Sequence, residues 1–324
     1  MAQAQPYLYE FYGLHWQLHE PNPLIAPPFG SPIIADPTFL CPDETPDGLW
    51  HLFAHSVWGL HHYISVNGLN WKHRKFLFTG AMRAHVYTEN KTFYLLYERY
   101  APMKLLVSWL PGLKWYSEIV VRRSDDLIRW SKPQTLLKPC LSWHTDATLG
   151  SAVSNPCLVK TGKQYRLYYS ASLVHLPDCG FNEPKYIGVA TSEKITGVYK
   201  PLSEPVIFPD AADNRCNLGA GAIKVICCTD GFVGFQNSIY QSPVTKKSGS
   251  AIQLLTSDDG VDWSYADAIP LLAPGAYNWM HSHVYALDVK KYNHCWHLYF
   301  NARNTWHWSK GREHIGLMTS LPLS

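Results

Sequence analysis

The chain has 324 residues, a formal net charge of +3 and 16% charged residues, fewer than the roughly 25% of an average globular protein. It has no concentrated run of basic residues, so a nucleic-acid partner is not expected. No apolar stretch approaches the ~18 residues of a transmembrane helix, and residues 1–23 lack the pattern of a signal peptide, so neither a membrane partner nor secretion is expected.

The eight cysteines form no CxxC pair and no tight framework. This spacing predicts reduced, mostly buried thiols in a cytoplasmic protein. Aromatic residues make up 14% of the chain, with 13 Trp and 20 Tyr. Such a surplus suits packing on pleated sheets, and it also suits stacking against sugar rings.

Similar runs of alternating apolar and aromatic residues recur along the chain, and turn residues follow each run. In chain order they are Trp50–His55, Phe93–Arg99, Tyr165–Ala171, Phe232–Ser238 and Trp296–Arg303. The alternation indicates short strands, and a repeat of this kind favours radially arranged antiparallel units. We therefore predict an all-β fold, a five-bladed β-propeller, rather than a β-sandwich. Residues 1–324 would form a single domain, with residues 1–32 as an N-terminal extension that packs on or closes the propeller.

The innermost strand of each blade is expected just before the aromatic run. These strands are predicted near 33–40, 83–89, 153–159, 219–225 and 281–287. Aligned by their apolar tails, they place five residues at the mouth of the central channel, namely Asp36, His85, Asn155, Gly221 and His283. Since the second strand is antiparallel to the first, its end returns to the same rim with His55, Glu98, Arg99, Gln236, Asn237, Arg303 and Asn304. The loop at 173–188 belongs to that rim too. Polar groups gathered there must be solvated or paired, so the mouth is the predicted functional site.

The phrase "IIADPTFL" at 33–40, together with "YRLYYSAS" and "IGVATSEKITGVY" in the third unit, resembles glycoside hydrolase family 43 and the related family 32. The resemblance implies that Asp36, which precedes Pro37, is the general base or nucleophile. Two departures stand out. Family 43 usually has a second Asp in the third blade, where this chain has Asn155. Its acid Glu usually starts the fourth inner strand, where this chain reads "NLGAGAIKV".

Three residues are candidates for the displaced general acid. Glu183, in the loop at 173–188, is the first choice. Glu98 is the second, although pairing with Arg99 would lower its pKa and suit it better to substrate anchoring. His283 is the third, by resemblance to family 117. The two leading catalytic candidates also have plainer interpretations, since Asp36 could cap a turn and Glu183 could be an ordinary surface residue.

The predicted sugar contacts are Arg83, His85, Asn155, His283, Arg303 and Trp58. His281 and His283 point the same way along a strand and could instead bind a metal, but no third ligand is evident. No cofactor is expected to be required, and the resemblance to family 43 makes a structural calcium ion in the channel conceivable.

The leading hypothesis is a glycosidase that acts on a small glycoside, with furanosides among its substrates. The first alternative is a non-catalytic carbohydrate-binding propeller that has lost its acid. The second is glycosyl transfer or phosphorolysis on the same scaffold, for which Arg83, Arg99 and Arg303 would supply the cations. A protein-interaction propeller is the least favoured, because it would leave the polar mouth unexplained.

Overall fold

The computed structural model describes residues 5–107, 112–275 and 277–322. In these residues the regular secondary structure consists mostly of antiparallel strands, and helices are confined to short turns. The turns are α1 (Tyr9–Tyr12) and the 3-10 helices η1 (Pro42–Glu44), η2 (Lys104–Val107), η3 (Ser142–His144) and η4 (Asn278–Met280). The predicted all-β class is therefore confirmed.

The strands form antiparallel units that follow one another along the chain. The first contains β2 (Ala35–Leu40), β3 (Trp50–Ser56), β4 (Gly59–Ser65) and β5 (Lys72–Thr79). The second contains β6 (Ala81–Glu89), β7 (Thr92–Tyr100), β8 (Trp115–Ser124) and β9 (Gln134–Leu137), and the short strands β10 (Thr145–Asp146) and β11 (Gly150–Ser151) extend it. The third contains β12 (Val153–Thr161), β13 (Gln164–Leu176), β14 (Phe181–Ser192) and β15 (Lys200–Pro201).

Two further units complete the described chain. The fourth contains β16 (Gly219–Cys228), β17 (Gly231–Gln241), β18 (Ser248–Ser257) and β19 (Ser264–Tyr265). The fifth contains β20 (His283–Tyr292), β21 (Cys295–Arg303) and β22 (Glu313–Pro322), and the N-terminal strand β1 (Leu14–Leu18) pairs with β22. One parallel bridge, between Ser250 and His283, joins the fourth unit to the fifth. Part of the predicted N-terminal extension is thus the outer strand of the last unit.

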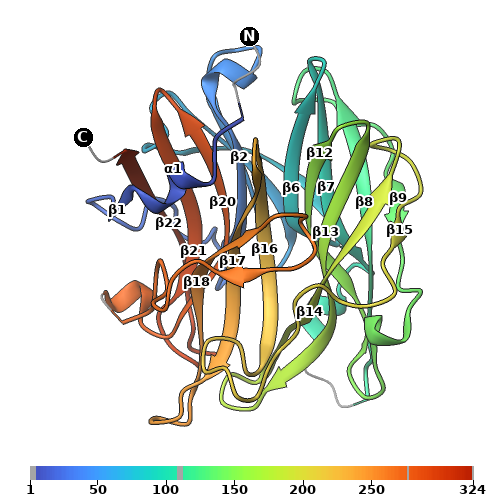
Figure 1. The fold of residues 1–324 in the computed structure, drawn as a ribbon, viewed down its shortest axis with the longest axis vertical. Helices are drawn as coiled ribbons and strands as arrows, with labels where there is room; N and C mark the ends of the chain where they lie inside the picture. Colours follow the sequence, from blue (N-terminus) through green and yellow to red (C-terminus); the bar gives the residue numbers. More distant parts are fainter. Residues whose placement is uncertain (1–4, 108–111, 276, 323–324) are drawn as a thin grey trace.

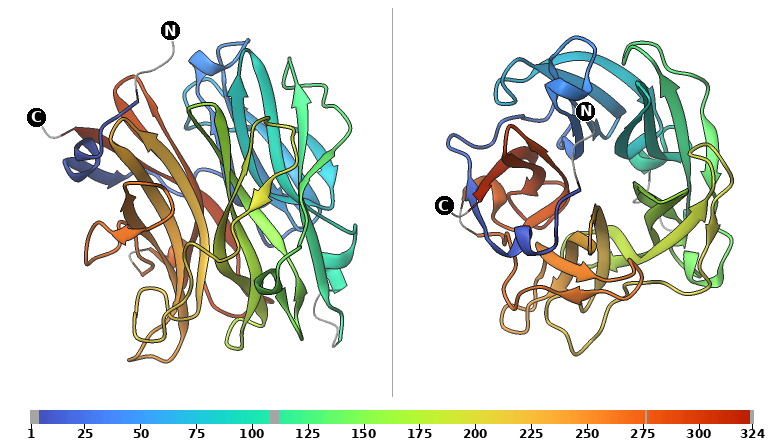
Figure 2. Two further views of the ribbon diagram at one scale, coloured as in Figure 1. Left: turned by 45° about the vertical axis from the view of Figure 1, so that its right-hand side comes forward. Right: turned by 45° about the horizontal axis from the view of Figure 1, so that its top comes forward.

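The units lie side by side around a central axis (Figure 2). The first strand of each unit contacts the first strands of its two neighbours, from β2 through β6, β12, β16 and β20 and back to β2. Buried apolar clusters fill the spaces between neighbouring units. Phe53 and Leu95 belong to the cluster between the first and second units, and Phe235 and Phe300 belong to the cluster between the fourth and fifth. The arrangement is propeller-like, and its inner strands lie where the sequence predicted them.

One hairpin is longer than the rest and projects beyond its own unit (Figure 1). Strands β13 and β14 stay paired out to Leu176 and Phe181, well past the part that packs in the third unit. The turn at its tip bonds to the fourth unit, where Asp178 accepts hydrogen bonds from the backbone and hydroxyl of Ser248 at 2.8 Å each. The tip also bonds to the fifth unit, since Trp308 N donates to Cys179 O at 2.9 Å. The hairpin therefore spans from the third unit to the fifth.

Candidate functional site

Each inner strand carries a β-bulge at the same level of the central channel. Two residues there stand opposite one residue of the neighbouring strand. The bulged pairs are Asp36-Pro37, Arg83-Ala84, Asn155-Pro156, Ala220-Gly221 and Tyr285-Ala286. A bulge re-aims side chains and is common beside active sites. The first three pairs adopt positive φ at their leading residue, with 51° at Asp36, 52° at Arg83 and 46° at Asn155. These three residues line one cavity.

The bulges correct the level at which two predicted residues lie. The sequence alignment placed His85 and His283 beside Asp36, whereas the strand register places Arg83 and Tyr285 there. The reason is that a bulge holds two residues against one, so apolar tails alone do not fix the register before it. His85 instead lines a second cavity farther along the channel, and its Nδ1 lies 3.3 Å from Nζ of Lys224.

Asp36 is held as a carboxylate. Its side chain is 15% exposed, and Oδ2 lies 2.7 Å from Nε2 of His55. Burial by itself favours the protonated form, but the bond to His55 and the positive charges of His55, Arg83 and Lys224 outweigh it and lower the pKa of Asp36. The side-chain oxygen of Asn301 accepts a hydrogen bond from the Asp36 backbone at 3.1 Å, which fixes the bulge. Asp36 can therefore act as a base or nucleophile.

Glu183 has the opposite character. It lies on β14 in the long hairpin, opposite Val174, and is 9% exposed. Burial raises its pKa to about 8, and the neighbouring carboxyls of Glu313 and Asp36 add to the rise, while Arg83 and Arg303 oppose it. A carboxyl group with this pKa is protonated near neutrality and can act as a general acid.

Small residues in the fourth unit let the hairpin approach the channel. A Cβ atom on Gly219 would lie 2.7 Å from the carbonyl oxygen of Pro184 and 3.3 Å from Cγ1 of Val174. The leading bulge residue of this unit is Ala220, which has no functional group. The stretch that lacks the expected carboxylate is therefore the stretch against which the Glu183 hairpin packs.

Glu98 is fully buried and is used as an ion-pair partner. Oε2 accepts a hydrogen bond from Nη1 of Arg83 at 2.9 Å, and Oε1 accepts one from Nε1 of Trp115 at 3.1 Å. The predicted pairing with Arg99 is wrong, because Arg99 pairs with Glu118 on the adjacent strand β8. Neighbouring residues of a strand point to opposite faces, which explains the difference. Glu98 thus positions Arg83 beside Asp36 and Glu183.

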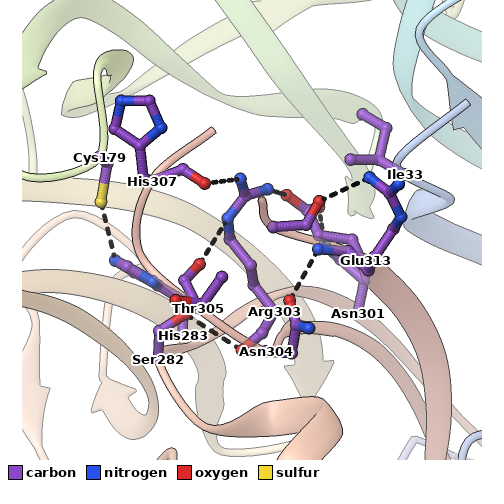
Figure 3. Close-up of polar contacts among 12 residues, drawn as sticks. Ile33, Cys179, Ser282, His283, Asn301, Arg303, Asn304, Thr305, His307 and Glu313 are labelled. Carbon is purple, nitrogen blue, oxygen red and sulfur yellow. Dashed lines mark hydrogen bonds and ion pairs between the residues drawn. The ribbon is translucent and has the colours of Figure 1, made fainter. Parts of the chain in front are cut away.

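A buried ion pair between Arg303 and Glu313 borders the site (Figure 3). Nη1 of Arg303 donates to Oε1 of Glu313 at 2.7 Å, and Nε donates to the carbonyl of Thr305 at 2.9 Å. Asn301 donates to the other oxygen of Glu313 at 2.9 Å, so one network connects this pair to the Asp36 bulge. Glu313 was not predicted from the sequence. Its position, opposite Arg303 on the paired strand β22, is the signal that could have identified it.

His283 is buried and contacts the tip of the long hairpin (Figure 3). Its Nε2 lies 3.7 Å from Sγ of Cys179 and 3.5 Å from Oγ of Ser248. Burial, with the charge of Arg303, lowers the pKa of His283 to about 3. The imidazole is therefore neutral near neutrality and is a poor candidate for the general acid.

The other predicted contacts are divided between the site and its surroundings. Asn155 lies in the cavity beside Asp36 and Arg83, and its amide donates to Oγ of Ser154 at 3.3 Å. Trp58 lies outside that cavity and lines a separate apolar groove with Phe76 and Met103. Within the described ranges, no group of three or more His, Cys, Asp or Glu residues is placed to hold a metal ion. The described helices include none long and apolar enough to cross a membrane.

The fold resembles solved structures of carbohydrate-active proteins. A glycosyl hydrolase from Bacteroides ovatus has a TM-score of 0.68 and 12% identity, covering 97% of this chain and 96% of its own. A structure from the GH130 family of mannoside phosphorylases and glycoside hydrolases has a TM-score of 0.64 and 13% identity, with 97% and 96% covered. A family 117 glycoside hydrolase from Zobellia galactanivorans has a TM-score of 0.59 and 10% identity, with 95% and 90% covered.

The sequence matches no protein-family model and no curated protein. At identities of 10–13% the likeness to these structures concerns the fold. The predicted resemblance to propeller-fold glycoside hydrolases is confirmed at that level.

Proposed function

We propose that the protein is a glycosidase in which Asp36 is the base or nucleophile and Glu183 is the general acid. The observation that carries the proposal is the contrast between the two carboxyl groups. The pKa of Asp36 is lowered, and that of Glu183 is raised to about 8 mainly by burial. Glycoside hydrolysis needs one ionised and one protonated carboxyl group around the scissile bond.

Glu183 would take the place of the carboxylate that the fourth inner strand lacks. The Glu183 hairpin packs over Gly219, so the acid would enter from the neighbouring unit. Arg83 would hold both carboxyls in place, since Glu98 fixes its guanidinium. We take the five antiparallel units to be the blades of a five-bladed propeller. The enclosed position of the two carboxyls suits a small glycoside or a chain end. Furanosides are the first substrates to be tested.

The reaction can be tested with p-nitrophenyl glycosides, chiefly furanosides, using the wild type and the variants Asp36→Asn and Glu183→Gln. We expect wild-type turnover and a loss of at least ~10³-fold in Asp36→Asn. Glu183→Gln should be most impaired on substrates with poor leaving groups, which depend on protonation. Absence of turnover in the wild type, with sugar binding retained in all three proteins, would leave the carbohydrate-binding alternative.

Phosphorolysis is the second candidate. The observation in its favour is the group of cations near Asp36, since Arg83 and Lys224 both lower the pKa of that carboxyl. A phosphorylase would require inorganic phosphate and release a sugar phosphate. Turnover of the same substrates with and without phosphate separates the two reactions. The cytoplasmic location also remains a proposal, which the free thiols of the eight cysteines support.

A further inference from the structure

Tyr285 occupies the channel level of Asp36 but was assigned no role by the sequence. It is the leading residue of the bulge in β20, as Asp36 is in β2 and Arg83 is in β6. Its side chain is 6% exposed. The inner-strand geometry therefore places a phenol at the same level as the proposed base.

The hydroxyl group of Tyr285 has no hydrogen-bond partner in the described part of the chain. Burial raises its pKa well above the ordinary value, and the facing carboxyls of Glu183 and Glu313 add to the rise, while Arg303 opposes it. The phenol is thus a neutral donor. Buried polar groups in native proteins are rarely left without a partner, and an unpaired one calls for a specific explanation.

The ring of Tyr285 is held in place by its neighbour on the same face of the strand. The rings of Tyr285 and His283 stack with centroids 5.2 Å apart and planes 5° from parallel. His283 is itself fixed between Cys179 and Ser248. A donor fixed in this way is preorganised for a ligand, because little side-chain freedom remains to be lost on binding.

We propose that the Tyr285 hydroxyl donates a hydrogen bond to an oxygen of the sugar bound between Asp36 and Glu183, and that it selects sugars carrying an oxygen at that position. The inference rests on the proposed function and adds the basis of its sugar selectivity. A site built to bond one hydroxyl discriminates strongly against the analogue that lacks it, because the buried partner is then left unpaired.

The test measures kcat/KM for the wild type and Tyr285→Phe on the p-nitrophenyl glycoside with the highest turnover and on each of its monodeoxy analogues. For the wild type, we expect kcat/KM on one deoxy analogue to be about 10²-fold or more below its value on the parent glycoside. Tyr285→Phe should lower kcat/KM on the parent glycoside by a similar factor. On that analogue its kcat/KM should equal that of the wild type. Equal parent-to-analogue ratios in the two proteins, for every position of the sugar, would overturn the inference.

Tyr168→Phe is the matched control. Its hydroxyl is also buried but donates to the carbonyl of Gly260 at 2.9 Å, away from the channel. Tyr168→Phe should lower the melting temperature and keep the wild-type ratios. Tyr285→Phe should melt at or above the wild-type temperature, because it removes an unpaired buried hydroxyl. A lower melting temperature with unchanged ratios would make Tyr285 a structural residue.

If the wild type turns over no glycoside, the proposed hydrolysis fails and Tyr285 can be judged by binding alone. Ligand-observed NMR with the parent glycoside and the same deoxy analogues would then be compared between the wild type and Tyr285→Phe. The inference is supported if removal of one particular sugar hydroxyl weakens binding to the wild type but does not weaken binding to the variant. Identical binding profiles in the two proteins would overturn it.

Discussion

Asp36 and Glu183 show how surroundings assign different roles to the same chemical group. His55, Arg83 and Lys224 place positive charge around Asp36, so its carboxylate is stabilised despite burial. Glu183 is buried with two other carboxyls nearby, and among the described residues its own carboxyl receives no hydrogen bond. Ionisation of Glu183 in the folded protein therefore lowers the free energy of unfolding.

This cost gives a stability prediction for Glu183→Gln. In the unfolded chain the carboxyl ionises near the ordinary value of 4.5, whereas in the folded protein it ionises near 8. The unfolded state binds fewer protons between these values, so this residue lowers stability as the pH rises from about 4.5 to 8. Glu183→Gln should therefore be more stable than the wild type at pH 9, and the difference should shrink toward pH 5. Denaturant unfolding at both pH values checks this, and an equal difference at both would contradict it.

At the same scale, the sequence predicted which polar residues face the channel better than it predicted their level. Asp36 and Asn155 share one cavity with Arg83, which takes the place predicted for His85. The strand register puts Tyr285 at the level predicted for His283. A weak signal was available. Each leading bulge residue is followed by Pro, Ala or Gly, as in Pro37, Ala84, Pro156, Gly221 and Ala286. The burial of Glu183 had no local signal, because contacts with other units create it.

At the scale of elements, the long hairpin β13–β14 decides where Glu183 lies. The hairpin is positioned by its tip contacts and by its close approach to Gly219. A single methyl group at residue 219 would meet the carbonyl of Pro184, so the strand that carries Glu183 would have to move. The proposed acid is thus placed by packing between units rather than by its own strand pairing alone.

Gly219→Ala tests this placement. The φ angle of Gly219 is not positive, so Ala at this position adds no backbone strain and acts only through the steric contact of its methyl group. We expect a fall of about 10²-fold in kcat/KM, because small displacements of catalytic groups are costly, while the circular dichroism spectrum stays unchanged. Gly13→Ala is the control, since its added methyl would meet no atom within 4 Å. Full activity in Gly219→Ala would show that the hairpin tolerates the shift.

The inner strands and the aromatic second strands were predictable from the sequence because alternation and turn residues are local features. The length of the β13–β14 hairpin was not, since the segment 173–188 contains Pro184 and was expected to be a loop. In the structure Pro184 pairs opposite Leu173 within the hairpin. Pairing between β13 and β14 holds this segment in strand form, and the backbone bond from Trp308 to Cys179 anchors its tip, which no pattern within the segment reveals.

At the scale of the whole molecule, the two ends of the chain complete one unit. Strand β1 pairs with β22, so Leu14 lies opposite Pro322. Phe11, just before β1, is 3% exposed and packs against Phe235 and Trp296. The N-terminal segment therefore contributes to the core between the last two units.

Phe11→Ala should lower the free energy of unfolding by about 3–5 kcal/mol, the range for deleting a buried Phe side chain. Tyr9→Ala is a matched control in the same short helix, because Tyr9 is 67% exposed, and it should have little effect. Denaturant unfolding of the two variants checks the contrast. A similar loss in both, or in neither, would mean that the N-terminal segment does not secure the fold.

The pairing of β1 with β22 also closes the last unit with strands from both ends of the described chain. Leu14 and Pro322 are paired neighbours, whereas Gln5 at the start of the described chain bonds to Thr229 in the fourth unit, so a linker would have to run from Pro322 to Gln5. New ends could be opened at the exposed turn formed by Gly162 and Lys163, between β12 and β13. Exposed tight turns are where circular permutation usually succeeds. A circularly permuted protein cut there would join β22 to the N-terminal segment through the linker and leave every strand pair intact.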